Sequence, residues 1–271
     1  MLNFFFGSKR KSVKTIQISL WAFVAAWILH AIGGLEPLRR WSFAVVSTLR
    51  EVRLFGGPDT KPSPEIVVCA IDEDSIRQMG VWPWPRSTYA KLVRQVAQDG
   101  AAAIGLNALL SERDPAGAGN DLDLVTQITK SGNTVLPCIV TLAGPSTSSA
   151  RTGRLPDIYP LPEYQQAAAG IGFVNVGADA AHIKIILTGR DAKNQPILSF
   201  PLAVYEGYAR QKVEVESWAA RVGDLKIPLE GQGLLWVDYP RAGPVPTGYT
   251  GTIIPASQVL NGTLKRGALA G

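Results

Sequence analysis

The 271-residue sequence has few of the residues on which several common chemistries depend. It contains two histidines and two cysteines, and the cysteines do not occur at metal-binding spacing. The phosphate-binding patterns GxGxxG and GxxxxGK followed by Ser or Thr are missing, as are the metalloprotease pattern HExxH and the hydrolase pattern GxSxG. The sequence therefore carries none of the usual signatures of nucleotide-binding proteins, zinc proteases and serine hydrolases.

Basic charge is concentrated at the N-terminus, and no basic surface pattern follows it. The formal net charge is +5 at pH 7, and part of it comes from Lys9, Arg10, Lys11 and Lys14. No later stripe of Lys and Arg alternates with aromatic residues, so the sequence does not predict a nucleic-acid partner. Hydrophobic residues make up 46% and charged residues 18%, which is typical of a globular chain rather than a disordered one.

An uncharged apolar segment covers residues 15–34. Its length is sufficient to cross a bilayer as a helix, so the sequence predicts one uncleaved transmembrane helix in the inner (cytoplasmic) membrane. Residues 1–14 are basic and are expected in the cytoplasm, which places residues 62–271 in the periplasm or outside the cell. Residues 35–61 contain apolar side chains at helical spacing and are predicted to form a stalk or membrane-surface helix and a connector.

Cys69 and Cys138 each lie among apolar neighbours in a predicted strand. Cysteine in such surroundings is most often a small buried hydrophobic side chain, so the sequence favours two free thiols. A disulfide is chemically allowed if the domain lies outside the cytoplasm, and the distance between the two strands decides between these alternatives.

The main domain begins with an apolar strand that ends in a cluster of acidic residues. Residues 66–71 are rich in β-branched side chains and are predicted to form a strand buried on both faces. Asp72, Glu73 and Asp74 follow directly, and Ser75 is placed to cap the next turn. Ligands often bind at the carboxyl ends of strands in α/β sheets, so these carboxylates form a candidate site. The alternative is that Asp72 or Asp74 only satisfies backbone N–H groups of the turn.

A tryptophan-proline segment, WPWPR, follows at residues 82–86. Each proline restricts its own backbone and that of the tryptophan before it, so Trp82 and Trp84 are expected on a stiff, non-helical segment. Such rings either plug the edge of a core or line a recognition surface. Arg86, beside them, is placed to pair with the carboxylates of the preceding turn.

The pattern after this segment alternates between helix and strand. Residues 87–100 are predicted to form an amphipathic helix and residues 101–110 a second buried strand. A shorter helix at 121–130 and a third strand at 134–142 complete a βαβαβ order, which implies parallel pairing. A long surface loop is predicted at 144–164. Further strands are predicted at 170–176, 183–187, 225–229, 234–239 and 251–254, and further helices at 198–211 and 255–260.

The sequence therefore predicts an α/β domain with a mixed, largely parallel sheet and flanking helices, preceded by one N-terminal transmembrane helix. The order of an apolar strand, IDEDS, a glycine, WPWPR, a helix with Tyr89, and GAAAIGLNALLSERDP resembles the second class of CHASE domain. That family comprises extracytoplasmic sensory modules attached to bacterial adenylate cyclases, histidine kinases and other effectors. The resemblance implies a sensory domain at residues 62–271, which is expected to lack the C-terminal end of a typical member.

Two positions depart from the family pattern. Asn107, predicted in the second strand, replaces a position that is usually acidic in the family, which argues against a carboxylate pair or metal site with Asp72. An amide at that position retains hydrogen-bonding capacity. The turn GADAAHIK at residues 177–184 retains Asp179 but lacks the second acid, the glycine and the arginine that usually follow.

Three functional hypotheses remain at this point. The first is a membrane-anchored sensory or interaction module that binds an unknown ligand or partner and signals through its membrane helix. The second is a non-catalytic accessory subunit of a membrane complex, in contact with integral membrane proteins or a second copy of the chain. The third is a metal-assisted hydrolase at the Asp72 turn. No cofactor, metal or catalytic residue is predicted under the first hypothesis, and its candidate ligand-binding residues are Asp72, Asp74, Ser75, Trp82, Trp84, Arg86 and Asn107.

Overall fold

The computed structural model describes residues 20, 21, 23, 24, 27, 63–80, 82–141, 157–175, 184–191, 194–216, 218–229, 233–236, 252–265 and 267–270. The chain divides into two units, Met1–Thr60 and Lys61–Gly271. In the first unit the described residues are helical, and most of the predicted span 15–34 and all of the stalk up to Thr60 lie outside them. Among the helices of the described residues, none combines the length and the apolar character needed to cross a membrane.

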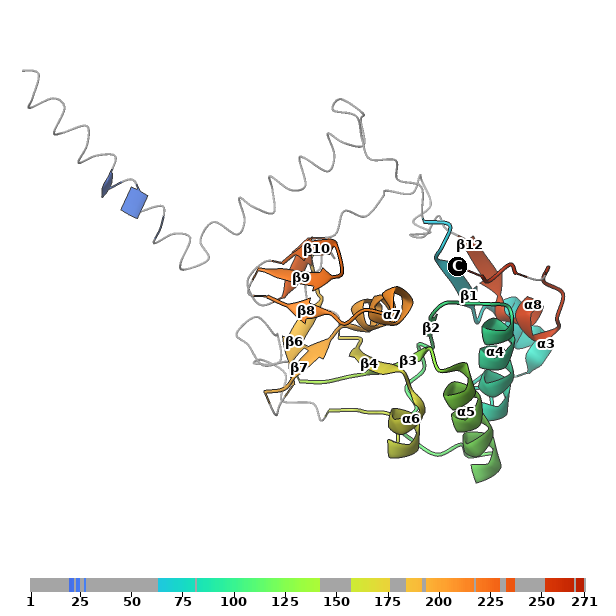
Figure 1. Ribbon diagram of the computed structural model, residues 1–271. Coiled ribbons are helices and arrows are strands. Elements are labelled where there is room, and N and C mark those ends of the chain that lie inside the picture. Colours follow the sequence, from blue (N-terminus) through green and yellow to red (C-terminus); the bar gives the residue numbers. More distant parts are fainter. Residues whose placement is uncertain are drawn as a thin grey trace, which may run out of the picture. The chain divides into compact units, whose positions relative to one another are not determined.

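Strands and helices alternate in the first half of the second unit in the predicted βαβαβ order, but the first strand pairs with β12 (Thr252–Pro255) and not with the second strand (Figure 1). Strands β2 (Ile104–Gly105), β3 (Thr134–Cys138) and β4 (Gly170–Phe173) form a parallel sheet in that order. Strand β1 (Val67–Ala70) pairs in parallel with β12 (Thr252–Pro255), which follows it by most of the length of the domain. The largely parallel architecture is therefore confirmed for these strands.

Two long helices cover one face of the parallel strands. Helices α4 (Arg86–Gln98) and α5 (Ala118–Ser131) pack against each other, with Tyr89 and Leu92 of α4 buried. Helix α5 ends at Gly132, whose left-handed backbone and N–H bond to the Ile128 carbonyl close the last turn. The core on this face contains Trp84, Tyr89, Leu92, Val93, Ile104, Leu106, Leu110, Leu124, Ile128, Leu136, Tyr164, Ile254 and Val259.

Three short helices complete this side of the domain. Helix α3 (Glu73–Met79) forms where the sequence suggests only a turn, and it packs against α8 (Ala256–Leu260). Helix α8 lies within the predicted helix at 255–260 and confirms it. Helix α6 (Pro162–Ala167) begins within the predicted surface loop 144–164, and its Tyr164 is fully buried.

Helix α7 (Phe200–Ala209) packs on the other face of β2, β3 and β4. The backbones approach closely there: a Cβ added to Gly172 of β4 would lie 2.5 Å from the Phe200 Cα. Only glycine permits this contact, because any side chain at that position would push the helix away from the strand. Figure 1 shows α7 on one side of the sheet and α5 on the other.

Short antiparallel strands form the rest of the unit. These are β5 (Lys184–Ile186) with β11 (Leu234–Trp236), β6 (Thr188–Arg190) with β7 (Pro196–Leu198), and the sheet of β8 (Glu214–Val215), β9 (Ala219–Val222) and β10 (Leu225–Pro228). They share a second core with α7, formed by Leu187, Leu202, Ala220, Val222 and Leu229. The prediction of a mixed sheet is thus confirmed in part: the described strands are partly parallel, but they form several sheets rather than one, and those of the second half pair antiparallel, β6 to β10 with near neighbours and β5 with the distant β11.

Two details of the predicted strands are also wrong. The first strand was expected to be buried on both faces, but its Val68 is 39% exposed and Ile253 of the paired strand β12 is 52% exposed, whereas α7 packs on β2, β3 and β4. The second strand was expected over 101–110, but it ends at Gly105, and one further bond joins the Leu106 N–H to the Val135 carbonyl. The chain turns away after this bond and loses its pairing with β3.

Both cysteines are free thiols, as their apolar neighbours predict. Burial, with a smaller contribution from Asp72, raises the pKa of Cys69 to about 11. Burial, with a smaller contribution from Asp157, raises the pKa of Cys138 to about 12. Neither side chain is a ready nucleophile or metal ligand at neutral pH, because each is held as the thiol.

Candidate functional site

The acidic turn after β1 is a helix cap. Asp72 is the N-cap of α3, and its Oδ1 accepts a hydrogen bond from the Ser75 N–H at 2.8 Å. Hydrogen bonding with Ser75, through its side chain and its backbone N–H, lowers the pKa of Asp72. Asp74 forms an ion pair with Arg77 on the exposed face of the same helix. The capping alternative is therefore confirmed for Asp72, and both carboxylates are engaged within α3.

Ser75 connects two helices and does not cap α3. The residue is 0% exposed, and its Oγ accepts a hydrogen bond from the Ser257 N–H at 3.0 Å. The two hydroxyl oxygens of Ser75 and Ser257 are 3.3 Å apart and also share a hydrogen bond. Because these bonds link α3 to α8, the predicted role of Ser75 as a cap is wrong.

The two tryptophans of the WPWPR segment have different environments. Trp84 is 2% exposed, its Nε1 donates a hydrogen bond to the Gly80 carbonyl at 3.0 Å, and its ring centroid lies 6.4 Å from that of Tyr89. Trp82 is 54% exposed. The interpretation as a core plug is therefore confirmed for Trp84, whereas Trp82 remains available at the surface.

Arg86 lies at the start of α4, next to Asp114. Asp114 Oδ2 accepts a hydrogen bond from the Arg86 N–H at 2.6 Å, and Oδ1 accepts one from the Ala116 N–H at 2.8 Å. Burial acts to raise the pKa of Asp114, but these bonds, one from the Asn120 side chain and the Arg86 charge together lower it. The Asp114 carboxylate thus caps α4, whose own N-cap residue Pro85 has no side-chain donor or acceptor. This bond uses the backbone of Arg86; among the described residues, no ion pair joins its guanidinium to the acidic turn after β1, contrary to the prediction.

A second buried carboxylate supports the first. Asp121 is 1% exposed and accepts hydrogen bonds from the Asp114 N–H at 3.0 Å and the Tyr164 hydroxyl at 2.7 Å. Burial and the bond to Asp121 raise the pKa of Tyr164, so its hydroxyl stays protonated and donates. An ion pair of 2.6 Å between Arg113 and Glu163 also joins the loop after β2 to α6. This polar cluster fixes the loop after β2 against α5 and α6.

Sequence reasoning did not identify this polar cluster. Asp114 lies in the ERDP segment, and an acid before proline at the end of a strand was the available signal. Asn107, which sequence reasoning selected, is exposed and lies beyond the end of β2. Within the described ranges, no group of three or more His, Cys, Asp or Glu residues is arranged to hold a metal ion.

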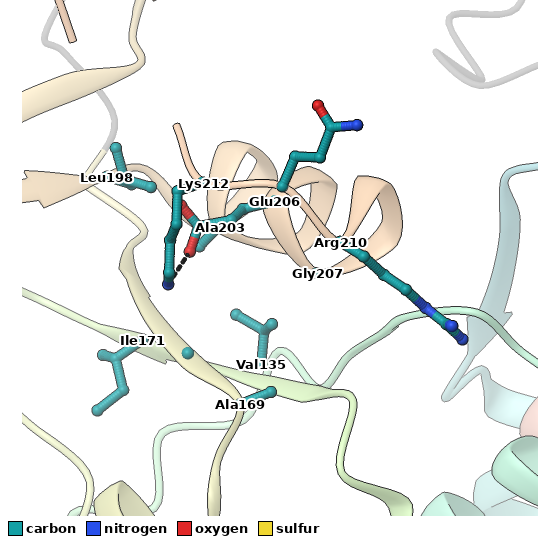
Figure 2. A pocket seen from close by; sticks show the side chains of 11 residues that line it. Val135, Ala169, Ile171, Leu198, Ala203, Glu206, Gly207, Arg210 and Lys212 are labelled. Carbon is teal, nitrogen blue, oxygen red and sulfur yellow. Dashed lines mark hydrogen bonds and ion pairs between the residues drawn. The ribbon is translucent and has the colours of Figure 1, made fainter. Parts of the chain in front are cut away.

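Two adjoining cavities lie beneath the C-terminal half of α7, where β3 and β4 begin. The first has a volume of about 400 Å³ and is lined by aliphatic side chains and the polar end of α7 (Figure 2). The second, of about 600 Å³, reaches the C-terminal ends of α4 and α5. Ala169, Gly207 and Arg210 line both cavities, so the two adjoin, and we call them together the α7 groove.

One cation in the α7 groove lacks an ion pair. Lys212 Nζ lies 2.7 Å from Glu206 Oε1, so these two charges neutralise each other. Arg210 is exposed, follows the last residue of α7 with φ of 53°, and makes no ion pair among the described residues. Figure 2 shows its side chain extending away from the Lys212–Glu206 pair. The α7 groove therefore offers a guanidinium group to an anionic ligand.

The fold and these sites define an α/β domain. The IDEDS and WPWPR motifs build its scaffold near the carboxyl ends of the strands, and the α7 groove lies where β3 and β4 begin. The family model of the CHASE2 domain matches residues 21–271, so the chain belongs to this family of extracytoplasmic sensory domains. The match confirms the resemblance seen in the IDEDS and WPWPR segments. No curated protein and no solved structure matches the chain.

Proposed function

We propose that this chain is a membrane-anchored sensory module that binds a ligand in the α7 groove without transforming it. Its main domain lies outside the cytoplasm, and the N-terminal apolar segment anchors it and transmits the bound state. Membership of the CHASE2 family supports the sensory role, and the charge-free segment 15–34 supports the anchor.

The observation that carries this proposal is the contrast between two ends of the domain. At the carboxyl ends of β1 and β2, Asp72, Ser75 and Asp114 are all engaged in hydrogen bonds that hold helices together. In the α7 groove, Arg210 has no ion pair among the described residues and borders two cavities. A side chain without structural partners beside an open cavity is the feature expected of a ligand site.

The difference between these two ends of the domain also supports a role in binding rather than in catalysis. The Asp72 carboxylate, on which the hydrolase hypothesis depended, has its pKa lowered by capping bonds and therefore stays an anion. A capped carboxylate anion is a poor general acid. The α7 groove presents Arg210 and the paired Lys212 and Glu206 as its charged side chains, an arrangement suited to holding an anion.

Hydrogen exchange on the full chain in detergent tests the ligand site. Adding a filtered extract of small molecules from the source cells should protect backbone amides at residues 131–135 and 200–212. The variant Arg210→Gln should lose this protection, while Arg94→Gln, an exposed arginine on α4, should keep it. Absence of protection in the α7 groove, or equal protection in both variants, would contradict the proposal.

A reporter fusion tests the anchor. Alkaline phosphatase joined after residue 271 should be active and the green fluorescent protein at the same position should be dark, because the first folds only outside the cytoplasm. The reverse pattern would place the domain inside. Deleting residues 15–34 should move the phosphatase fusion to the inactive state.

A further inference from the structure

We propose that the segment after α8 is a releasable strap that braces one wall of the α7 groove. We call it the α8 strap and define it as residues 264, 265 and 267–270. The inference rests on the proposed function of the α7 groove and adds how that groove is regulated. The docked α8 strap holds the wall of the second cavity in place, and its release loosens that wall.

A single carboxylate clasps the backbone of the α8 strap. Asp99 Oδ1 accepts a hydrogen bond from the Gly267 N–H, and Asp99 Oδ2 accepts one from the Leu269 N–H, each at 2.6 Å. Hydrogen bonds to a carboxylate are shorter and stronger than those between neutral groups. Both oxygens of the Asp99 side chain are therefore engaged by the α8 strap.

The position of Asp99 indicates that its carboxylate serves the α8 strap and not α4. Asp99 is the C-cap of α4, where the helix dipole places negative potential, and the last turn of α4 contains no basic residue. A carboxylate at this end repels the helix that carries it. The two N–H groups of the α8 strap offset this repulsion. Replacing Asp99 with asparagine would therefore relieve α4 and break the clasp at the same time.

The backbone of the α8 strap forms a turn of its own. The Ala268 N–H donates to the Lys265 carbonyl at 3.1 Å, and the Ala270 N–H donates to the Gly267 carbonyl at 3.3 Å. Gly267 has a φ of 81°, a conformation that glycine adopts without strain. The turn is therefore held by bonds within the α8 strap, and these bonds do not depend on its contact with α4.

Few contacts attach this turn to the rest of the domain. Leu269 is 7% exposed and belongs to the core of α4 and α5, and Leu264 packs against the same core while partly buried. Within the described residues, no strand pairs with the α8 strap. A segment that is attached by few apolar contacts opens at a lower free energy than the core elements. We therefore expect the α8 strap to leave α4 while the remaining domain stays folded.

The α8 strap touches a wall of the second cavity. Gly100 lines this cavity and follows Asp99 directly, and a Cβ built on Gly100 would lie 3.4 Å from the Ala270 Cβ. Ala101, the next wall residue, accepts a hydrogen bond at its carbonyl from Asn133 Nδ2 at 2.7 Å, and Asn133 lines the same cavity. Release of the α8 strap removes the partners of Asp99 and Gly100, so the wall loses its support on that side.

Native-state hydrogen exchange of the full chain in detergent, at several low urea concentrations, tests whether the α8 strap is releasable. The amides of Gly267 and Leu269 should exchange through a local opening that depends little on urea. The amides of Val135 and Leu136 in β3 should exchange only through global unfolding, which depends strongly on urea. If the amides of the α8 strap exchange only together with those of β3, the proposal is overturned.

The Asp99→Asn variant tests whether the α8 strap braces the wall. It should speed exchange at Gly267 and Leu269 roughly tenfold or more, because hydrogen bonds to a charged group are lost. The same variant should also speed exchange at Gly100 and Ala101, whose N–H groups bond to the carbonyls of the last turn of α4. Faster exchange in the α8 strap without any change at these two wall residues would overturn the proposal.

A comparison with β3 separates this role from general support of the fold. In Asp99→Asn, exchange at Val135 and Leu136 should rise by a smaller factor, because asparagine also relieves the repulsion at the end of α4. The matched control Asp224→Asn, in an exposed turn, should change none of these rates. An equal rise in the α8 strap and in β3 would mean that Asp99 supports the whole fold, which overturns the proposal.

The two proposals fail in different ways, because the exchange experiments on the α8 strap use no ligand. If the α8 strap opens locally together with the wall but the cell extract does not protect the α7 groove, the ligand site is wrong and the strap stands. If the extract protects the α7 groove but the α8 strap opens only with the whole domain, the strap is wrong and the ligand site stands.

Discussion

At the scale of single residues, the two tryptophans of the WPWPR segment differ in burial and therefore in role. Trp84 is 2% exposed and Trp82 is 54% exposed, although each precedes a proline. The chain bends at Trp82 and Pro83, so the two rings diverge instead of lying on one side. The ring of Trp84 then packs with Tyr89 and fixes the start of α4 on the core.

Replacing each tryptophan with alanine should therefore change the free energy of unfolding by different amounts. Trp84→Ala should lower the free energy of unfolding by about 3–5 kcal/mol, the usual result of removing a buried large aromatic side chain. Trp82→Ala should change it by less than about 1 kcal/mol, because the ring is mostly in water. Urea unfolding followed by circular dichroism measures both values. Equal losses in the two variants would contradict the burial seen here.

At the scale of elements, helix α4 depends on a cap that comes from another loop. The Asp114 carboxylate accepts the Arg86 N–H across 28 residues of sequence. Asp121 in turn accepts the Asp114 N–H, so the cap is held by a second buried carboxylate. Hydrogen bonds thus join the start of α4 to the loop after β2, and that loop to α5.

The Asp114→Asn variant tests this cap through its dependence on pH. The folded-state pKa of Asp114 is lowered, so its contribution to stability is full above the ordinary carboxyl pKa of about 4 and is lost as the pH falls below it. The difference in unfolding free energy between wild type and Asp114→Asn should therefore be of order 1–3 kcal/mol at neutral pH and shrink on acidification.

Urea titrations at neutral pH and at about pH 3 give the two differences. Asp224→Asn serves as the matched control, because this exposed aspartate lies in the turn between β9 and β10. A difference that stays constant between the two pH values would mean that the Asp114 carboxylate does not act as a charged cap.

At the scale of the whole domain, α7 lies between the parallel sheet and the second core. One of its faces lies on β2, β3 and β4, and Leu202 belongs to the second core with Leu187 and Val222. The contact with β4 is backbone to backbone at Gly172. Because the α7 groove lies beneath the same helix, a change in its packing affects both the second core and the candidate site.

A methyl group at Gly172 should separate α7 from β4. Gly172→Ala places a Cβ 2.5 Å from the Phe200 Cα and should cost about 1–3 kcal/mol through overpacking. Gly170→Ala, in the same strand, meets only Val135 Cγ2 at 3.8 Å and should be tolerated. Thermal unfolding of the two variants makes the comparison, and equal midpoints would show that the helix adjusts without loss.

Several elements followed from local patterns. The amphipathic helix at 87–100 and the third strand at 134–142 were predicted from the sequence, and the structure confirms them as α4 and β3. The candidate site was not predictable in the same way. Arg210 lies at the end of a predicted helix, and nothing in its neighbours indicated that Ala169 and the ends of α4 and α5 would surround it.

The sequence by itself determined the family, the helices α4, α5, α7 and α8 and the parallel strands, because periodicity and short motifs are properties of neighbouring residues. Only the tertiary structure decided which polar residues hold the fold and which remain for a ligand. The bond between Ser75 and Ser257 joins positions 182 residues apart, and that between Arg86 and Asp114 joins positions 28 apart. A hydrogen-bonding group is free or engaged only with respect to its partners in space, and no local pattern contains them.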